Sequence, residues 1–103
     1  MVKLTVLYGT PTDPAAFDAY YFGTHVPVAE KIPGLKRNEV SKASSNPDGS
    51  APPFYLQAEL YFDSPEALMG ALGSEEGQAA AADVAKFATG SVTMTICEVL
   101  KEI

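Results

Sequence analysis

At residues 54–62 the chain reads FYLQAELYF, and the side chains alternate between two kinds along the whole run. Successive side chains of a strand point to opposite faces of a sheet. One predicted face holds Phe54, Leu56, Ala58, Leu60 and Phe62. The opposite face holds Tyr55, Gln57, Glu59 and Tyr61, which is amphipathic rather than typical of a solvated surface. The stretch therefore predicts a strand with one face in the core and a second face that also needs cover.

Turn residues separate this strand from its neighbours in the sequence. Residues 44–53 are rich in Ser, Pro and Asp and predict a long turn, which joins the strand to a polar edge strand over residues 35–43. After the strand, Ser64 and Pro65 predict a helix start, because serine caps free N–H groups and proline fits the first helical position. This helical region is expected to be interrupted by its glycines, to restart at residues 74–76 and to continue to Phe87.

The flanks of the chain complete the pattern. Residues 2–8 and 92–99 alternate as strands, and Pro14, preceded by Thr12 and Asp13, predicts a helix that ends at residues 33–34. The inward face of this helix is expected to hold Phe17, Tyr21, Thr24 and Val28, with Tyr20 and His25 beside it. The order β-α-β-β-α-β predicts an α+β, ferredoxin-like fold with a four-stranded antiparallel sheet and both helical regions on one face.

Composition limits the class of protein. The 103 residues are 47% hydrophobic and 19% charged, which fits a single domain over residues 1–103. The net charge of −6 disfavours binding to nucleic acid or to an anionic membrane surface, and no apolar run is long enough to span a membrane. Cys97 is the single cysteine, which excludes an internal disulfide. With no secretory signal in the first residues, we expect a cytoplasmic protein.

The second face of the sheet predicts an assembly. Tyr55, Tyr61, Leu7 and Val99 are expected to lie on the face that the helices do not cover. Exposed apolar patches of this kind usually mark an interface. We therefore expect a homodimer joined sheet to sheet.

His25 is the one histidine, and Tyr21 lies one helical turn before it. Histidine titrates near neutral pH, so His25 is a candidate acid or base, assisted by Tyr20 or Tyr21. The alternative is a histidine that only fills space in the core. Asp18 lies about 10 Å away along the helix axis, so a group that orients His25 is expected to come from the sheet.

The other reactive residue types have structural explanations. Glu59 is expected to form a salt bridge with Arg37 or Lys36, although a general base is the alternative, and Cys97 is expected to be a buried structural thiol. One histidine with scattered carboxylates makes a poor metal site, and residues 9–12 lack the features of a phosphate-binding loop. No metal and no cofactor are therefore expected.

One longer pattern resembles a known family. Residues 17–29, FDAYYFGTHVPVA, followed by IPGL at 32–35, resemble the F-x-x-Y-Y-x-x-x-H-x-P-x-A…P-G-L signature of the EthD family, named for ethyl tert-butyl ether degradation. Residues 62–67 and 83–87 resemble its third-strand exit and second helix. The resemblance implies a dimeric α/β barrel with a site near His25. Related barrels include lactone isomerases, polyketide cyclases, and cofactor-free or haem-using oxygenases.

Two functions from different classes follow. The first is a pocket for a small, largely apolar organic molecule, in which His25 acts as acid or base with Tyr21 assisting. The expected pocket walls are Phe17, Tyr20, Val28 and Phe62. The second is a binding or accessory protein that holds the same kind of molecule without chemistry. A haem-dependent oxygenase would need His25 as the iron ligand.

Overall fold

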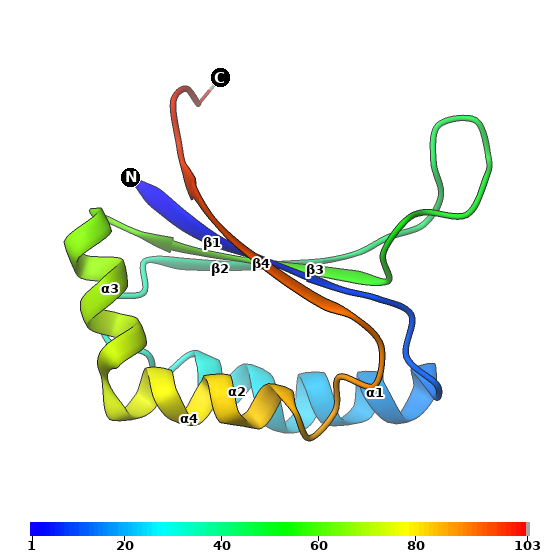
Figure 1. Ribbon diagram of the computed structural model, residues 1–103, viewed down its shortest axis with the longest axis horizontal. Coiled ribbons are helices and arrows are strands. Elements are labelled where there is room, and N and C mark those ends of the chain that lie inside the picture. Colours follow the sequence, from blue (N-terminus) through cyan, green and yellow to red (C-terminus); the bar gives the residue numbers. More distant parts are fainter. Residues whose placement is uncertain (103) are drawn as a thin grey trace.

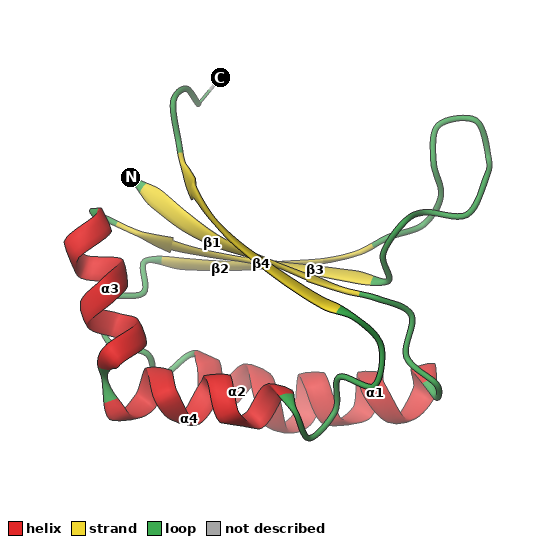
Figure 2. Cartoon of the chain, viewed as in Figure 1, coloured by secondary structure: helices red, strands yellow, loops and turns green. Residues whose placement is uncertain are grey.

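The computed structural model describes residues 1–102 and contains one antiparallel sheet with helices on one of its faces (Figure 1, Figure 2). The strands are β1 (Val2–Tyr8), β2 (Arg37–Lys42), β3 (Leu56–Phe62) and β4 (Val92–Glu98). Their order in the sheet is β2-β3-β1-β4, so β2 is an edge strand, as its polar sequence predicted. The α+β, ferredoxin-like fold is confirmed.

The central strands β1 and β3 carry the core. Their helix-facing positions are buried: Val2, Leu4, Val6 and Tyr8 on β1, and Leu56, Ala58, Leu60 and Phe62 on β3. The antiparallel register pairs Val6 with Ala58 and Leu4 with Leu60, so the two apolar rows lie side by side. Two adjoining rows form a continuous apolar floor, on which the helices pack.

The prediction for Tyr55 is wrong. β3 begins at Leu56, and Tyr55 precedes it, so the alternation along the strand does not set the side on which this ring lies. The ring packs edge-on against Phe17 with 5.4 Å between the centroids, and its hydroxyl donates to Asp18 at 2.9 Å. Both partners belong to the helix layer, so Tyr55 lies on the covered side.

The first helical region consists of α1 (Pro14–Tyr20), a π-helical turn η1 (Tyr21–His25) and α2 (Val26–Ala29). Its buried residues are Phe17, Tyr21, His25 and Ala29. This four-residue spacing would drift around an α-helix of 3.6 residues per turn, and the wider π turn removes the drift. The expected inward residue Thr24 is therefore exposed, and His25 is buried in its place.

The second helical region bends at Ser74. α3 (Pro65–Gly73) begins at a Ser64 cap, and α4 (Glu75–Val84) begins at Ser74, which accepts from the Gly77 N–H at 3.0 Å. Figure 1 shows α3 running down from the sheet to meet α4, which lies along the first helical region. A Cβ atom on Gly77 would collide with the carbonyl oxygen of Ala71. This glycine therefore allows the close approach that places α4 beneath the sheet.

The other face of the sheet has no helix over it within residues 1–102 (Figure 1). Leu7, Tyr61 and Val99 are half-buried there. Glu59 pairs with Lys3 of the neighbouring strand, so the expected partners Arg37 and Lys36 are wrong.

The register explains the choice of partner. Lys3 and Arg37 both pair with Tyr61, from opposite sides, and both are diagonal neighbours of Glu59. Arg37 contacts Glu39 on its own strand instead, which leaves Glu59 to Lys3. In the described chain, no helix is long and apolar enough to cross a membrane.

Candidate functional site

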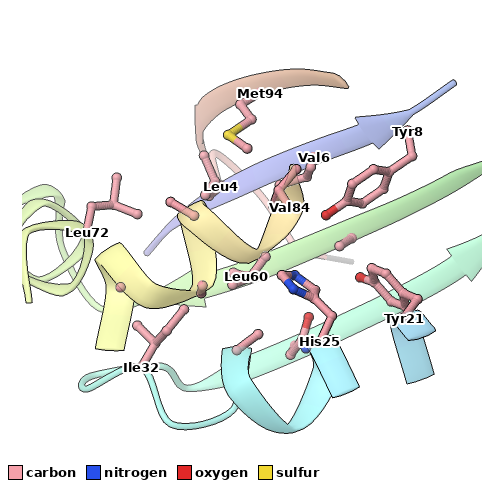
Figure 3. A pocket seen from close by; sticks show the side chains of 16 residues that line it. Leu4, Val6, Tyr8, Tyr21, His25, Ile32, Leu60, Leu72, Val84 and Met94 are labelled. Atoms are coloured by element: carbon pink, nitrogen blue, oxygen red, sulfur yellow. The ribbon is translucent and has the colours of Figure 1, made fainter. Parts of the chain in front are cut away.

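A cavity of about 70 Å³ lies between the helices and the sheet (Figure 3). Most of its walls are apolar and come from every layer of the fold: Leu4, Val6, Leu60, Ile32, Val84 and Met94. Met94 is 49% exposed, so the cavity is open towards the β4 edge of the sheet. The site is a small, mainly apolar space with a route to solvent.

Polar groups enter this cavity from a few positions. Figure 3 shows the ring of His25 and the hydroxyls of Tyr8 and Tyr21 pointing into it. Asn38 of β2 also lines it. A few polar groups converging in an apolar pocket are typical of a small-molecule site.

His25 is held by Asp83 of α4. The distance from His25 Nδ1 to Asp83 Oδ2 is 2.9 Å, and the two residues are 6% and 7% exposed. The hydroxyl of Tyr20 donates to the other oxygen, Oδ1, at 2.6 Å. Burial would raise the pKa of Asp83, but the hydrogen bonds from Tyr20 and His25 outweigh it and hold the pKa below its usual range. Asp83 is therefore a carboxylate at neutral pH.

The carboxylate sets the orientation and tautomer of the imidazole. An ionised carboxylate only accepts hydrogen bonds, so Nδ1 of His25 carries the proton that lies between the two side chains. In the neutral ring the lone pair is then on Nε2, which makes no hydrogen bond within the described chain. Nε2 is thus the ring nitrogen that can accept a proton from a molecule in the cavity.

Aromatic rings fix the position of the imidazole. Phe87 lies 4.7 Å from His25 and 5.5 Å from Tyr21 between ring centroids, and Tyr21 stacks on Phe17 at 5.6 Å. Burial raises the pKa of Tyr21 to about 12, so its hydroxyl stays protonated and can donate a hydrogen bond. Burial, followed by the nearby Tyr21 and Asp83, also raises the pKa of Tyr8.

The structure separates the residues that the sequence grouped as one site. His25 and Tyr21 line the cavity. Phe17 and Tyr20 lie on the outer side of the aromatic cluster, along a shallow surface hollow. Val28 is half-buried, and the π turn places Ala29 at the cavity instead. Phe62 is fully buried at the end of β3, opposite Val2, and does not line the cavity.

Sequence reasoning missed Asp83 and Asn38 as site groups. The expectation that the sheet would orient His25 is wrong, because α4 supplies the carboxylate. An acidic residue on an alanine-rich helix, one turn before Phe87, was the available signal for Asp83. For Asn38, in a weakly alternating edge strand, the sequence carries no such signal.

The cavity does not fit a haem group. An engineered cavity of about 150 Å³ holds one benzene ring, and this cavity is about half that size, whereas a porphyrin is several times larger than benzene.

Comparison with known proteins gives close matches over nearly the full chain. The EthD domain family model matches residues 9–91. An uncharacterized 11.0 kDa protein of the thcB-thcC intergenic region of Rhodococcus erythropolis is 49% identical over 94 residues, which cover 91% of this chain and 90% of that protein. An EthD family protein from Bacillus halodurans C-125 is 43% identical with a TM-score of 0.91, covering 97% of this chain and 99% of that one.

More distant solved structures share the fold. SnoaB, a cofactor-independent oxygenase from Streptomyces nogalater, is 14% identical with a TM-score of 0.72, covering 99% of this chain and 95% of that one. A dimeric protein of unknown function with a ferredoxin-like fold, from Bacteroides fragilis, is 18% identical with a TM-score of 0.66 and covers 95% of both chains. The dimeric barrel implied by the sequence resemblance is consistent with such neighbours.

Proposed function

This chain belongs to the EthD family, as the signature in residues 17–35 predicted, and from that premise we propose that it binds a small, largely apolar organic molecule in its cavity and moves a proton on it. The observation that carries the proposal is the buried His25–Asp83 pair, which directs Nε2 into an apolar space. A packing histidine has no need of an oriented carboxylate and a lone pair that faces a cavity.

The proton transfer uses three side chains. Nε2 of His25 accepts a proton from a C–H or O–H group of the ligand, and Asp83 stabilises the imidazolium that forms. The negative charge left on a ligand oxygen accepts a hydrogen bond from the Tyr21 hydroxyl. His25 then returns the same proton to another atom of the ligand, so the net reaction is an isomerisation or a step of a cyclisation and consumes no co-reactant.

The lining and the size of the cavity support this class of ligand. Apolar walls strengthen a hydrogen bond or charge interaction made between them, because water is excluded. A volume of about 70 Å³ selects a compact molecule, with the flexible Met94 side chain at the opening able to adapt to a ring. SnoaB, with the same fold, is a cofactor-independent oxygenase, and cofactor-free oxygenation is the reaction class that we place second.

The test compares variants on a ligand found by thermal-shift screening of aromatic and lactone compounds. His25→Gln should lower turnover by roughly 10² to 10⁴ fold while the protein stays folded. Tyr21→Phe should lower it less. Asp83→Asn should also lower turnover and should shift its pH profile, because Asp83 acts through the imidazole.

Asp18→Asn is the matched control. Asp18 is an acid of α1 that pairs with Lys42 at 2.6 Å and with Tyr55, outside the cavity lining, so turnover should not change. A ligand whose affinity and conversion are the same in His25→Gln and Tyr21→Phe as in wild type would contradict the proposal. A ligand that binds in the cavity and is never converted would favour the non-catalytic binding protein instead.

We also propose that the protein acts as a cytoplasmic homodimer joined through the open face of the sheet. Leu7, Tyr61 and Val99 give that face apolar area beside its polar groups, and structural neighbours include proteins described as dimeric. Tyr61→Glu should produce monomer or aggregate in light scattering. A wild-type protein that is monomeric at micromolar concentration would contradict the proposal.

A further inference from the structure

One polar atom in the cavity has no partner. Asn38 lies on β2 opposite Leu60, so its side chain is on the helix-facing side of the sheet. Its oxygen, Oδ1, is buried and makes no hydrogen bond to any group of residues 1–102. Burying an acceptor without a partner is unfavourable, and native proteins satisfy most such atoms. This acceptor therefore needs a donor that the described chain does not supply.

The other polar groups around the cavity do not meet that need. Asp83 and Nδ1 of His25 bond to each other, and the Tyr20 hydroxyl is used by Asp83. Nε2 of His25 is an acceptor in this tautomer, as Oδ1 of Asn38 is. The hydroxyls of Tyr8 and Tyr21 also line the cavity, but neither makes a hydrogen bond to Oδ1 of Asn38. The cavity thus offers two acceptors, on different elements, beside these two hydroxyls and within walls that are otherwise mainly apolar.

We propose that Asn38 selects ligands that carry a hydroxyl group, by accepting its hydrogen bond at Oδ1. The ligand class is then a compact alcohol, phenol or enol, with its apolar part against Leu60 and the other aliphatic walls. This inference rests on the proposed function, because it uses the same cavity. A site built to bind a hydroxyl rejects an analogue without one, because the buried partner is left unpaired.

Phenol and toluene form a matched pair of probes, and both require the flexible Met94 side chain at the opening to move aside for the ring. They have the same ring and substituents of nearly the same size, and only phenol donates a hydrogen bond. Their dissociation constants should be measured by NMR titration with wild type and with Asn38→Leu. The preference for phenol over toluene should fall at least about tenfold in Asn38→Leu. Comparing the ratio in the two proteins cancels the different solubilities of the probes in water.

Two further measurements separate this effect from a general change in the protein. Asn46→Leu, a control in the 44–53 connector, should keep the wild-type ratio. Asn38→Leu should raise the melting temperature of the ligand-free protein, because it removes a buried acceptor without a partner and fills its space with carbon. A lowered melting temperature together with an unchanged ratio would overturn the inference.

The outcomes distinguish this inference from the proposed function. If phenol keeps its advantage in Asn38→Leu but His25→Gln loses turnover, the inference fails and the proposed function stands. If the advantage is lost in Asn38→Leu while turnover is insensitive to His25→Gln, the inference stands and the chemistry fails. If neither probe binds wild type, the inference fails, and the proposed function is still decided by the screened ligand and His25→Gln.

Discussion

Asp83 and Glu59 are equally buried acids, 7% and 8% exposed, on opposite sides of the same sheet. Each has a basic partner, and each has a pKa below its usual range. Glu59 accepts hydrogen bonds from Lys3 and Gln57, and neither of these partners lines the cavity. Asp83 holds a ring whose second nitrogen is directed at an apolar cavity. Burial of a charge therefore does not mark a site, whereas an oriented partner with a free acceptor does.

The largest change in the free energy of unfolding is expected from removing the ring of Phe87, which packs on the cavity side of the sheet. Phe87 is 5% exposed and packs against Tyr8, Tyr21 and His25. Phe87→Ala should lower the free energy of unfolding by about 3–5 kcal/mol, because it leaves a void in a packed core. Urea unfolding measures the change. A cost below about 1 kcal/mol would mean that the aromatic cluster does not hold the imidazole in place.

Neutral isosteres of the two acids test the comparison directly. Asp83→Asn should cost about 1.5–3 kcal/mol, because it weakens two short hydrogen bonds to a buried charge. Glu59→Gln should cost less than about 1 kcal/mol, because the Lys3 side chain is 27% exposed to water. Both are measured by urea unfolding at pH 7. An equal cost for Glu59→Gln would show that the Lys3–Glu59 pair is as enclosed as the cavity side.

Low pH should reduce the stability contributed by both carboxylates, Asp83 on one side of the sheet and Glu59 on the other. A carboxyl group with a lowered pKa in the folded state contributes stability above its ordinary pKa of about 4, and this stability is lost as the pH falls through the folded value. The free energy of unfolding should therefore decline below about pH 4. Each of Asp83→Asn and Glu59→Gln should flatten part of that decline. A profile of Asp83→Asn that runs parallel to wild type would contradict the lowered pKa.

The smallest change in the free energy of unfolding is expected at Lys86, the exposed partner of Asp83. Lys86 Nζ lies 4.0 Å from Asp83 Oδ1, and its side chain is 69% exposed. Solvent screens such pairs, so Lys86→Ala should change the free energy of unfolding by less than about 0.5 kcal/mol. Turnover should also be unchanged. A large loss would show that Lys86, rather than Tyr20 and His25, keeps Asp83 charged.

Local chemistry made most of the fold predictable. Asp13 and Ser64 were recognisable as caps, and the twofold alternation identified β1 and β3, because both signals act within a few residues. The sequence also brought Tyr21 and His25 together, one turn apart. It placed Thr24 inward because a period of 3.6 residues was assumed, and the π turn changes that period.

The rest of the site depends on how distant elements pack. Asp83 reaches His25 because α4 lies along the first helical region, and Gly77 permits the bend that puts it there. Asn38 reaches the cavity because β2 joins the sheet through β3. The local sequence pattern does not predict these contacts, because they join residues that are more than forty positions apart or that lie on different layers.

The π turn at Tyr21–His25 can be described as an α-helix that holds one residue more than a regular helix would. Gly23 in this turn faces open space, so its deletion would remove no side-chain contact of its own. The shortened helix would regain regular hydrogen bonds and keep both flanking faces inward. It would also draw the imidazole back along the axis by about 1.5 Å, out of its present position against Asp83. Deleting one residue would thus give a more regular helix, whereas this chain has the irregular helix that sets the position of His25.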